Sequence, residues 1–247
     1  MFSSNLLRDC CCLRRSSKNN FALNPPESLI SLDSGHIGQE VVILKNGKRV
    51  CGSGGAVLNQ ALLQSKSYFE VKIQQSGHWS LGLCTLNTDL NKTRGGLDKF
   101  SWCLNAENYV MNDGHVLYDL NEMYSSNGNK TSNDDTEQLL PLNNKEDITN
   151  LLPSSSNASQ RSALPQEGDI IGITYDHIEL NFYLNGKNLN IPTLIKLNST
   201  STRGEYNNEI YPLLVVDDGA ILDLIVDNFN YQIPSGYDKI MVEQTLL

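Results

Sequence analysis

Residues 167–186 show the most regular alternation of apolar and polar positions in the chain. A first run places Ile171 and Ile173 on one face, and a second run, residues 178–184, has an apolar side chain at every other position. Alternation with period two predicts antiparallel strands that cover a core with one face. The second run ends at Asn185-Gly186, which is typical of a tight type I′ hairpin turn because both turn residues need a positive φ.

The same alternation recurs in many short runs from residue 29 to the end of the chain. Turns rich in Gly, Asn and Asp separate these runs, and we expect a second type I′ hairpin at Asn46-Gly47. The pattern predicts no amphipathic helix of ten or more residues. Many short strands at regular spacing are typical of an all-β protein, here an antiparallel β-sandwich.

Three polar stretches fall outside this pattern and set the expected domain organisation. Residues 1–28 form a basic, Cys-rich tail that we expect to be flexible, and residues 29–247 form one all-β domain. Polar insertions interrupt the domain at about residues 121–163 and 192–208. Long loops without periodicity are usually disordered or functional, so the first insertion is either a tolerated surface loop or carries an interaction motif around Ile148 to Leu152.

Charge is distributed unevenly along the chain, whose formal net charge is −9. Residues 1–20 hold four basic residues and one acidic residue, a net of +3, so the remainder carries −12. An acidic body without a basic stripe argues against a nucleic-acid partner, because phosphate contacts dominate that affinity. The sequence shows no signal peptide and no apolar run near the ~20 residues that span a bilayer, so we predict a cytoplasmic protein.

The cysteines divide into two groups. Cys51, Cys84 and Cys103 lie singly in or beside apolar runs, and we expect them to be small buried hydrophobic residues in a reducing compartment. Cysteine spacing along the chain matches neither a disulfide framework nor a zinc site. We therefore predict no metal and no cofactor.

The other three cysteines, Cys10, Cys11 and Cys12, are consecutive and lie between Arg8 and Arg14-Arg15. Adjacent cysteines with basic neighbours suit S-acylation. Two or three acyl chains, or one chain with a basic patch, anchor a protein stably to a membrane. We therefore expect these three residues to be lipidation sites that tether the domain to cytoplasmic membranes; the alternative is an unmodified tail.

No group of residues in the sequence forms a convincing catalytic site. The acidic pairs Glu167/Asp169 and Asp217/Asp218 fall in predicted turns, where carboxylates cap backbone donors. His177 is accompanied by no Ser or Cys nucleophile elbow. Gly52-Ser53-Gly54-Gly55 lacks the Lys-Ser/Thr ending and the following helix of a phosphate loop. A hydrolase is therefore a distant alternative, and we expect the protein not to be an enzyme.

Five segments together resemble the SPRY (B30.2-like) domain family, in an order and spacing that match it over roughly residues 36–247. They are Ser67 to Ile73, Gly77 to Leu83, Gly168 to Gly172, Phe182 to Lys187 and Tyr211-Pro212-Leu213. Three further segments resemble a small member of the family that is little more than the domain. They are Val50 to Gly55, Thr174 to Asn181 and Val216-Asp217-Asp218. This chain departs from the family in its longer polar insertions.

The resemblance implies a bent sandwich of two antiparallel sheets, concanavalin-like, and no catalysis. It also implies the class of partner, which is a peptide or a folded protein that a monomeric domain recognises through loops at one end of the sandwich. The residues that we expect at this surface are Gly52, Ser53, Gly54, Gly55, Arg94, Asp217, Asp218 and Gly219.

Asp217 and Asp218 occupy positions where related adaptor proteins carry an apolar and aromatic pair. Two adjacent carboxylates indicate a basic or amide-rich ligand, and the alternative is that Asp217-Asp218-Gly219 is only a polar turn. A rival function from another class is that of a structural component of a larger intracellular assembly, which would use a sheet face or an insertion instead of the loop end.

Overall fold

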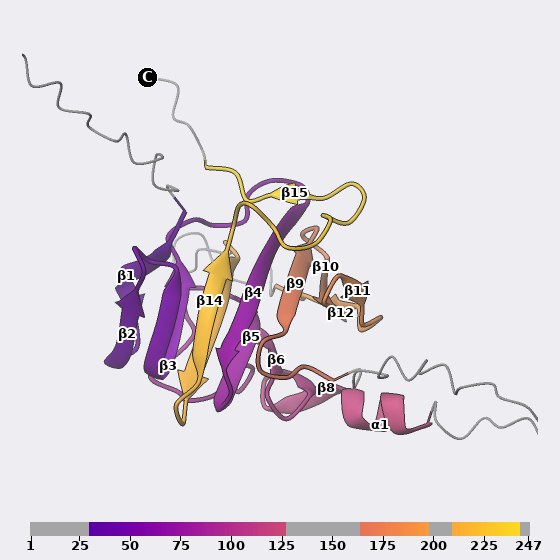
Figure 1. The fold of residues 1–247 in the computed structure, drawn as a ribbon, viewed down its shortest axis with the longest axis horizontal. Helices are drawn as coiled ribbons and strands as arrows, with labels where there is room; N and C mark the ends of the chain where they lie inside the picture. The colour runs from indigo at the N-terminus through magenta and orange to yellow at the C-terminus, as the bar shows by residue number, and fades with distance from the viewer. Residues whose placement is uncertain (1–29, 127–163, 198–208, 243–247) are drawn as a thin grey trace, which may run out of the picture.

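The computed structural model describes residues 30–126, 164–197 and 209–242, and almost every regular element in them is a β-strand (Figure 1). The first eight strands precede α1 (Leu120–Ser126): β1 (Leu32–Ile37), β2 (Glu40–Leu44), β3 (Arg49–Leu58), β4 (Ser67–Gln75), β5 (His78–Cys84), β6 (Ser101–Asn105), β7 (Tyr109–Asn112) and β8 (His115–Asp119). The others follow it: β9 (Ile170–Tyr175), β10 (Glu179–Leu184), β11 (Lys187–Asn188), β12 (Thr193–Leu194), β13 (Tyr211–Asp217), β14 (Ile221–Ile225) and β15 (Asp238–Lys239).

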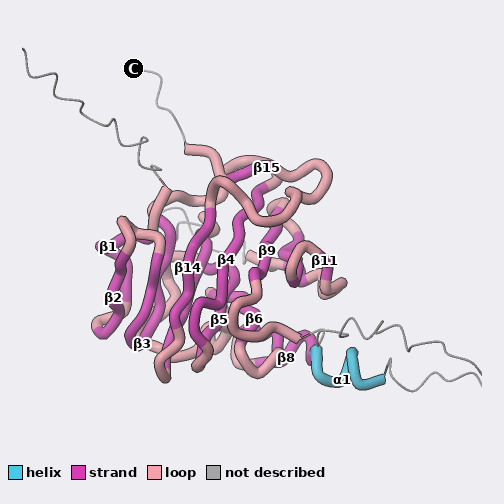
Figure 2. The backbone as a smooth tube through the Cα atoms, viewed as in Figure 1, coloured by secondary structure: helices cyan, strands magenta, loops and turns pink. Residues whose placement is uncertain are grey.

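The strands form one curled sheet in the order β11-β10-β9-β4-β14-β3-β13-β5-β6-β7-β8. β3 belongs to both layers of the curl, because its first half pairs with β2 and β14 and its second half with β1 and β13. The ladders are antiparallel except for the short pairing of β15 with β4. The expected all-β, bent antiparallel sandwich is confirmed (Figure 2).

Two glycines allow β3 to bend from one layer into the other. Gly52 has φ +100° and Gly54 has φ +122°, values that other residues rarely adopt. A glycine inside a strand commonly marks such a bend or a close backbone approach. The bend brings the two inner faces together around a core whose largest fully buried side chains include Tyr175, Phe69 and Phe182.

Strand burial follows the predicted alternation where only one sheet face is covered. β10 alternates between half-buried and buried residues, whereas every residue of β9 is buried. The outer face of β9 is covered in part by Tyr68, whose hydroxyl would lie 2.7 Å from a Cβ added at Gly172. Ile178, the first residue of the second predicted run, instead lies 65% exposed in the turn before β10, where its N–H donates to Asp176.

A buried carboxylate holds the C-terminal segment against β4. Glu70 is 0% exposed and accepts hydrogen bonds from the Tyr68 hydroxyl (2.9 Å) and the Tyr231 N–H (3.0 Å). Its other oxygen accepts from the backbone N–H (2.9 Å) and side-chain amide (3.2 Å) of Asn230. Burial, followed by the hydrogen bond to Glu70, raises the pKa of Tyr68. Glu70 and Asn230, which are 160 positions apart in the chain, are thereby joined.

The two expected hairpins have different outcomes. Leu184 pairs with Lys187, and φ is +49° at Asn185 and +78° at Gly186, which confirms the two-residue turn. The prediction of a two-residue turn at Asn46-Gly47 is wrong, because Leu44 pairs with Arg49 and leaves a four-residue loop. Lys45, Asn46 and Gly47 all have positive φ there.

The structure also differs from the expected insertion ranges at two edges. Residues 121–126 belong to α1, which Asp119 caps by accepting from the N–H groups of Asn121 (2.9 Å) and Glu122 (3.3 Å). Thr193 and Leu194 form β12, which pairs with β10. Of the two expected insertions, the structure describes residues 121–126 and 192–197. The remaining insertion residues, which include Ile148 to Leu152, lie outside the described residues, as does the tail at 1–28. Within the described part of the chain, no helix is long and apolar enough to cross a membrane.

Candidate recognition surface

The turn between β13 and β14 carries the two predicted recognition carboxylates. Asp218 has φ +49° and Gly219 φ +78°, and the Ala220 N–H donates to the Asp217 carbonyl at 3.0 Å, as in a type I′ turn. β13 pairs with β5 and β14 with β4, so this turn joins the two layers of the curl. Asp217 is half-buried, whereas Asp218 and Gly219 are exposed.

The β4–β5 turn lies directly against this turn and supports it. His78 is the register partner of Asp217, and Gln75 that of Ile221. A Cβ at Gly77 would lie 2.6 Å from the Asp218 carbonyl oxygen, so only glycine permits the two turns to approach so closely. The backbone that presents Asp217 and Asp218 is therefore fixed by its neighbour.

Asp217 and Asp218 differ from Asp169 and Glu167 in what their carboxylate oxygens contact. Asp169 accepts from the Gln166 N–H at 2.9 Å, and Glu167 accepts from the Ser76 N–H at 2.9 Å, which confirms that these two cap backbone donors. The carboxylates of Asp217 and Asp218 accept no hydrogen bond from any described residue and form no ion pair with one. The prediction that Asp217 and Asp218 cap backbone donors is therefore wrong, and their acceptor capacity is not used to hold the turn.

Gly52 to Gly55, which we expected in a loop at one end of the sandwich, lie inside β3. Gly54 and Gly55 are buried, because the Gly55 N–H donates to the Leu90 carbonyl at 2.7 Å and the loop around Leu90 covers them. Only Gly52 is exposed, and Ser53 is half-buried. The expectation of a loop is therefore wrong, because these glycines bend a strand and allow close backbone contact. Of the four residues, only Gly52 and Ser53 are accessible to a partner.

Arg94 lies in the loop of residues 86–99 and forms an ion pair with Glu107, with 2.7 Å between Nη2 and Oε1. Glu107 follows Ala106, whose N–H donates to the Trp79 carbonyl beside His78. These contacts place Arg94 at the same end of the curl as Asp217. Figure 1 shows the start of β14, the β4–β5 turn and α1 along one edge of the molecule. Because Glu107 balances Arg94, the carboxylates of the β13–β14 turn have no cationic partner there.

The Asp98 side chain accepts several hydrogen bonds that fix the loop of residues 86–99. Its Oδ1 accepts from the Phe100 N–H (2.9 Å) and from the hydroxyls of Thr88 (3.1 Å) and Ser101 (3.0 Å). The Ser101 hydroxyl in turn accepts from the Gly96 N–H at 3.0 Å. These side-chain hydrogen bonds hold the loop together with backbone bonds such as that from the Gly55 N–H to the Leu90 carbonyl.

An apolar cluster under this loop anchors it to the outer face of the sheet. The cluster consists of Val57, Cys84, Cys103, Leu213 and Val215, with Leu90 packed on it. Cys84 and Cys103 are free thiols, and burial raises the pKa of both. The expectation of small buried hydrophobic residues is confirmed for these two, whereas Cys51 is half-buried.

The sequence did not show that Gly77, His78 and Glu107 lie near the β13–β14 turn. Their proximity depends on strand register, which an alternating pattern does not specify between strands distant in sequence. Among the described residues, no three His, Cys, Asp or Glu side chains lie close enough to hold a metal ion. Cys10, Cys11 and Cys12 lie outside the described residues.

Comparison with known proteins extends over nearly the whole chain. A family model described as "SPRY domain" matches residues 66–228. Proteins named SPRY domain-containing protein 7 from Homo sapiens and Mus musculus are each 37% identical over 238 residues, which cover 96% of this chain and 96% of the relative. The protein of that name from Gallus gallus is 38% identical over the same length.

Two solved structures are also similar in part. A stonustoxin structure aligns with a TM-score of 0.45 and 13% identity, covering 79% of this chain and 27% of the toxin chain. The crystal structure of the TRIM65 PSpry domain aligns with a TM-score of 0.45 and 12% identity, covering 79% of this chain and 88% of that domain.

Proposed function

The chain belongs to the SPRY domain family, and from this premise we propose that it is a non-enzymatic interaction module that binds a peptide or folded protein through the loop end of the curl. Members of this family are typically protein-interaction modules. One observation supports the choice of surface: Asp217 and Asp218 are held on a rigid turn, yet their carboxylates bond to no described residue.

The chemistry of that turn selects the class of ligand. Two carboxylates offer several acceptor positions and no donor, so they suit guanidinium, ammonium or amide donors. A hydrogen bond to a charged group contributes about 1.5–3 kcal/mol, and an Arg side chain can engage a carboxylate with two parallel bonds. The body of the chain, which carries −12, attracts basic ligands over longer range. The partner segment is therefore basic or amide-rich.

A peptide library with varied net charge tests this specificity. We expect the wild-type protein to enrich Arg-, Lys- and Asn/Gln-rich peptides, and the double variant Asp217→Asn with Asp218→Asn to lose at least about ten-fold in affinity for them, since one charged hydrogen bond is worth about that much. Asn tolerates the positive φ of Asp218, so the turn is retained.

The chain offers a matched control for this test. Asp113 and Gly114 form a second turn of the same shape, with φ +51° and +72°, and both are exposed. Asp113→Asn removes one carboxylate charge from the same backbone geometry, between β7 and β8, as the change at Asp218 does. Equal loss in the control, or no loss in the double variant, would show that the carboxylates of the β13–β14 turn are not the recognition groups.

We further propose that the tail tethers this module to cytoplasmic membranes through acylation of Cys10, Cys11 and Cys12, which lie among basic residues. The basic tail would face an anionic leaflet, and the acidic body would be repelled from it. Acyl-exchange labelling of the full chain should give a strong signal that disappears when all three cysteines are changed to Ser. Equal labelling of the triple variant and the wild type would contradict the proposal.

A further inference from the structure

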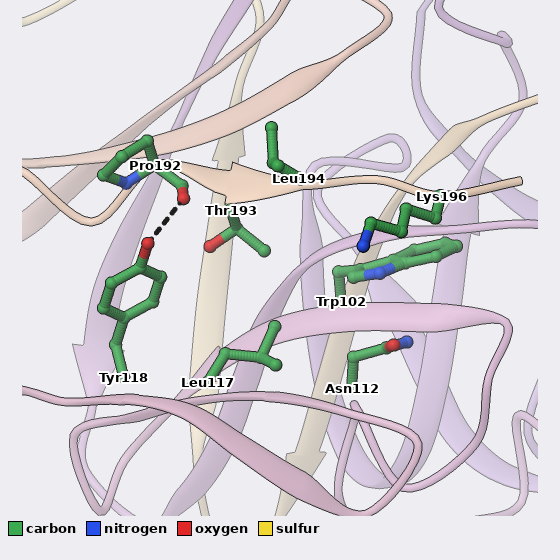
Figure 3. A pocket seen from close by; sticks show the side chains of 8 residues that line it. All are labelled: Trp102, Asn112, Leu117, Tyr118, Pro192, Thr193, Leu194 and Lys196. Carbon is green, nitrogen blue, oxygen red and sulfur yellow. Dashed lines mark hydrogen bonds between the residues drawn. The ribbon is translucent and has the colours of Figure 1, made fainter.

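A pocket separate from the loop end opens between β8 and the extended segment of residues 191–197. Its volume is about 430 Å³, and Tyr118 closes one side by donating to the Pro192 carbonyl at 2.7 Å (Figure 3). Trp102 lies in the pocket wall near the start of β6, whereas Glu107 follows the other end of that strand. The pocket and the β13–β14 turn therefore lie at different ends of the sheet.

A β-bulge turns an apolar side chain of β8 toward this pocket. Val110 pairs with Tyr118 and the next residue, Met111, pairs with Val116, so Leu117 has no partner on β7. The extra residue of a bulge is re-aimed relative to its strand, and bulges are common beside binding sites. Leu117 and Tyr118 consequently both line the pocket, although neighbouring strand residues normally point to opposite faces.

On the opposite wall, exposed and buried residues alternate, and the exposed ones include an apolar residue and a cation. Thr193 and Ile195 are buried, whereas Pro192, Leu194 and Lys196 are exposed along the same segment. Leu194 and Leu117 are 55% and 44% exposed, which is high for large apolar side chains on facing walls. This apolar part of the pocket fits an aliphatic side chain of a ligand.

The pocket lining holds the Asn112 amide, whose oxygen is an acceptor, and two donors that have no described partner. Lys196 forms no ion pair and no hydrogen bond with a described residue, and neither does the indole N–H of Trp102. Lys196 and Trp102 both line the pocket (Figure 3). An ammonium and an indole N–H can only donate, so the complementary group is an acceptor, and the positive charge of Lys196 favours a carboxylate.

The edge of the sheet adds a requirement on ligand shape. β8 is the last strand in the order on its side, and no described strand pairs with its outer edge. An exposed edge has unpaired backbone groups that can pair with an extended peptide, while alternate side chains enter a neighbouring pocket. We propose that this pocket is a second binding site, which holds an extended peptide carrying an acidic side chain next to an aliphatic one.

Nuclear magnetic resonance can test this proposal, because the chain has two tryptophans. Trp79 lies in the core but outside the pocket lining, so its indole N–H serves as an internal reference for that of Trp102. The full chain is titrated with the probe Ac-Leu-Glu-Leu-NH₂. We expect a saturable shift of the Trp102 signal, a smaller or no shift of the Trp79 signal, and no comparable response to Ac-Leu-Lys-Leu-NH₂.

Charge reversal at the pocket distinguishes specific binding at this site from nonspecific binding. Lys196→Glu should weaken binding of the Glu probe by about ten-fold or more and create binding of the Lys probe. Lys187→Glu, on exposed β11 outside the pocket lining, should leave both unchanged. The variant Asp217→Asn/Asp218→Asn should also leave the Trp102 shift unchanged, so the outcome does not depend on the loop-end proposal.

Two results would overturn the second site. One is a Trp102 signal that does not respond to the Glu probe, or responds equally in Lys196→Glu. The other is a response that appears only after residues 127–163 are deleted, since the chain's own insertion would then be the occupant.

Discussion

Glu70→Gln should lower the free energy of unfolding by about 3 kcal/mol or more, because it replaces one of the two buried carboxylate oxygens, each of which accepts two hydrogen bonds, with an NH₂ group. Both carboxylate oxygens of Glu70 accept two hydrogen bonds each, from Tyr68 and Tyr231 on one oxygen and from Asn230 on the other. Either orientation of a Gln amide would direct its NH₂ group at two of these donors. Urea unfolding followed by the fluorescence of the buried Trp79 and Trp102 measures the change.

An exposed glutamate provides the control for this substitution. Glu40, at the start of β2, is exposed, and Glu40→Gln should change the free energy of unfolding by less than about 0.5 kcal/mol. If both variants lost the same small amount of stability, the Glu70 carboxylate would not be the anchor of the C-terminal segment, and the cover over the outer face of β4 would need another explanation.

Gly82→Ala should cost about 3 kcal/mol of unfolding free energy, because the added methyl group has no space between β5 and β6. Its Cβ would lie 2.0 Å from the Trp102 carbonyl oxygen and 2.9 Å from the Cys103 Cα, both of them backbone atoms. β5 pairs with β13 on its other edge, so it cannot move away without breaking a second ladder. The same urea titration measures the loss.

Gly35→Ala is the matched control for this overpacking. Gly35 is exposed in β1, and the atom nearest to its added Cβ, at 3.2 Å, is the Asp33 Oδ1 of a side chain that can move. We expect a change below about 1 kcal/mol. A Gly82 variant as stable as the Gly35 variant would mean that β5 and β6 are less closely packed than their register implies.

The alternating runs predicted the fold class well because half-covered strands such as β10 show their burial directly in the sequence. The sequence could not show that β3 serves both layers, since the positive φ at Gly52 and Gly54 is a property of the folded backbone. The four glycine-rich positions therefore seemed to be a loop. α1 was missed because seven residues are too few for a reliable helical period.

The candidate site was predictable only in part, and for a similar reason. Asp217-Asp218-Gly219 is recognisable as a turn from local residue types. That the carboxylates of Asp217 and Asp218 remain unbonded, while Glu167 caps Ser76, depends on contacts between segments distant in sequence. The pocket beside Lys196 depends on a bulge at Leu117, which no pattern in the sequence marks.

Affinity capture from a cell lysate, quantified by mass spectrometry, tests the central claim most directly. It compares the wild type, the Asp217→Asn/Asp218→Asn variant and the Asp113→Asn control, after circular dichroism shows that all three are folded. Loop-end recognition predicts a stoichiometric partner that the wild type and the control retain and the double variant loses. A partner retained by all three proteins would contradict it and would place the interaction on a sheet face or an insertion, as expected of a component of a larger assembly.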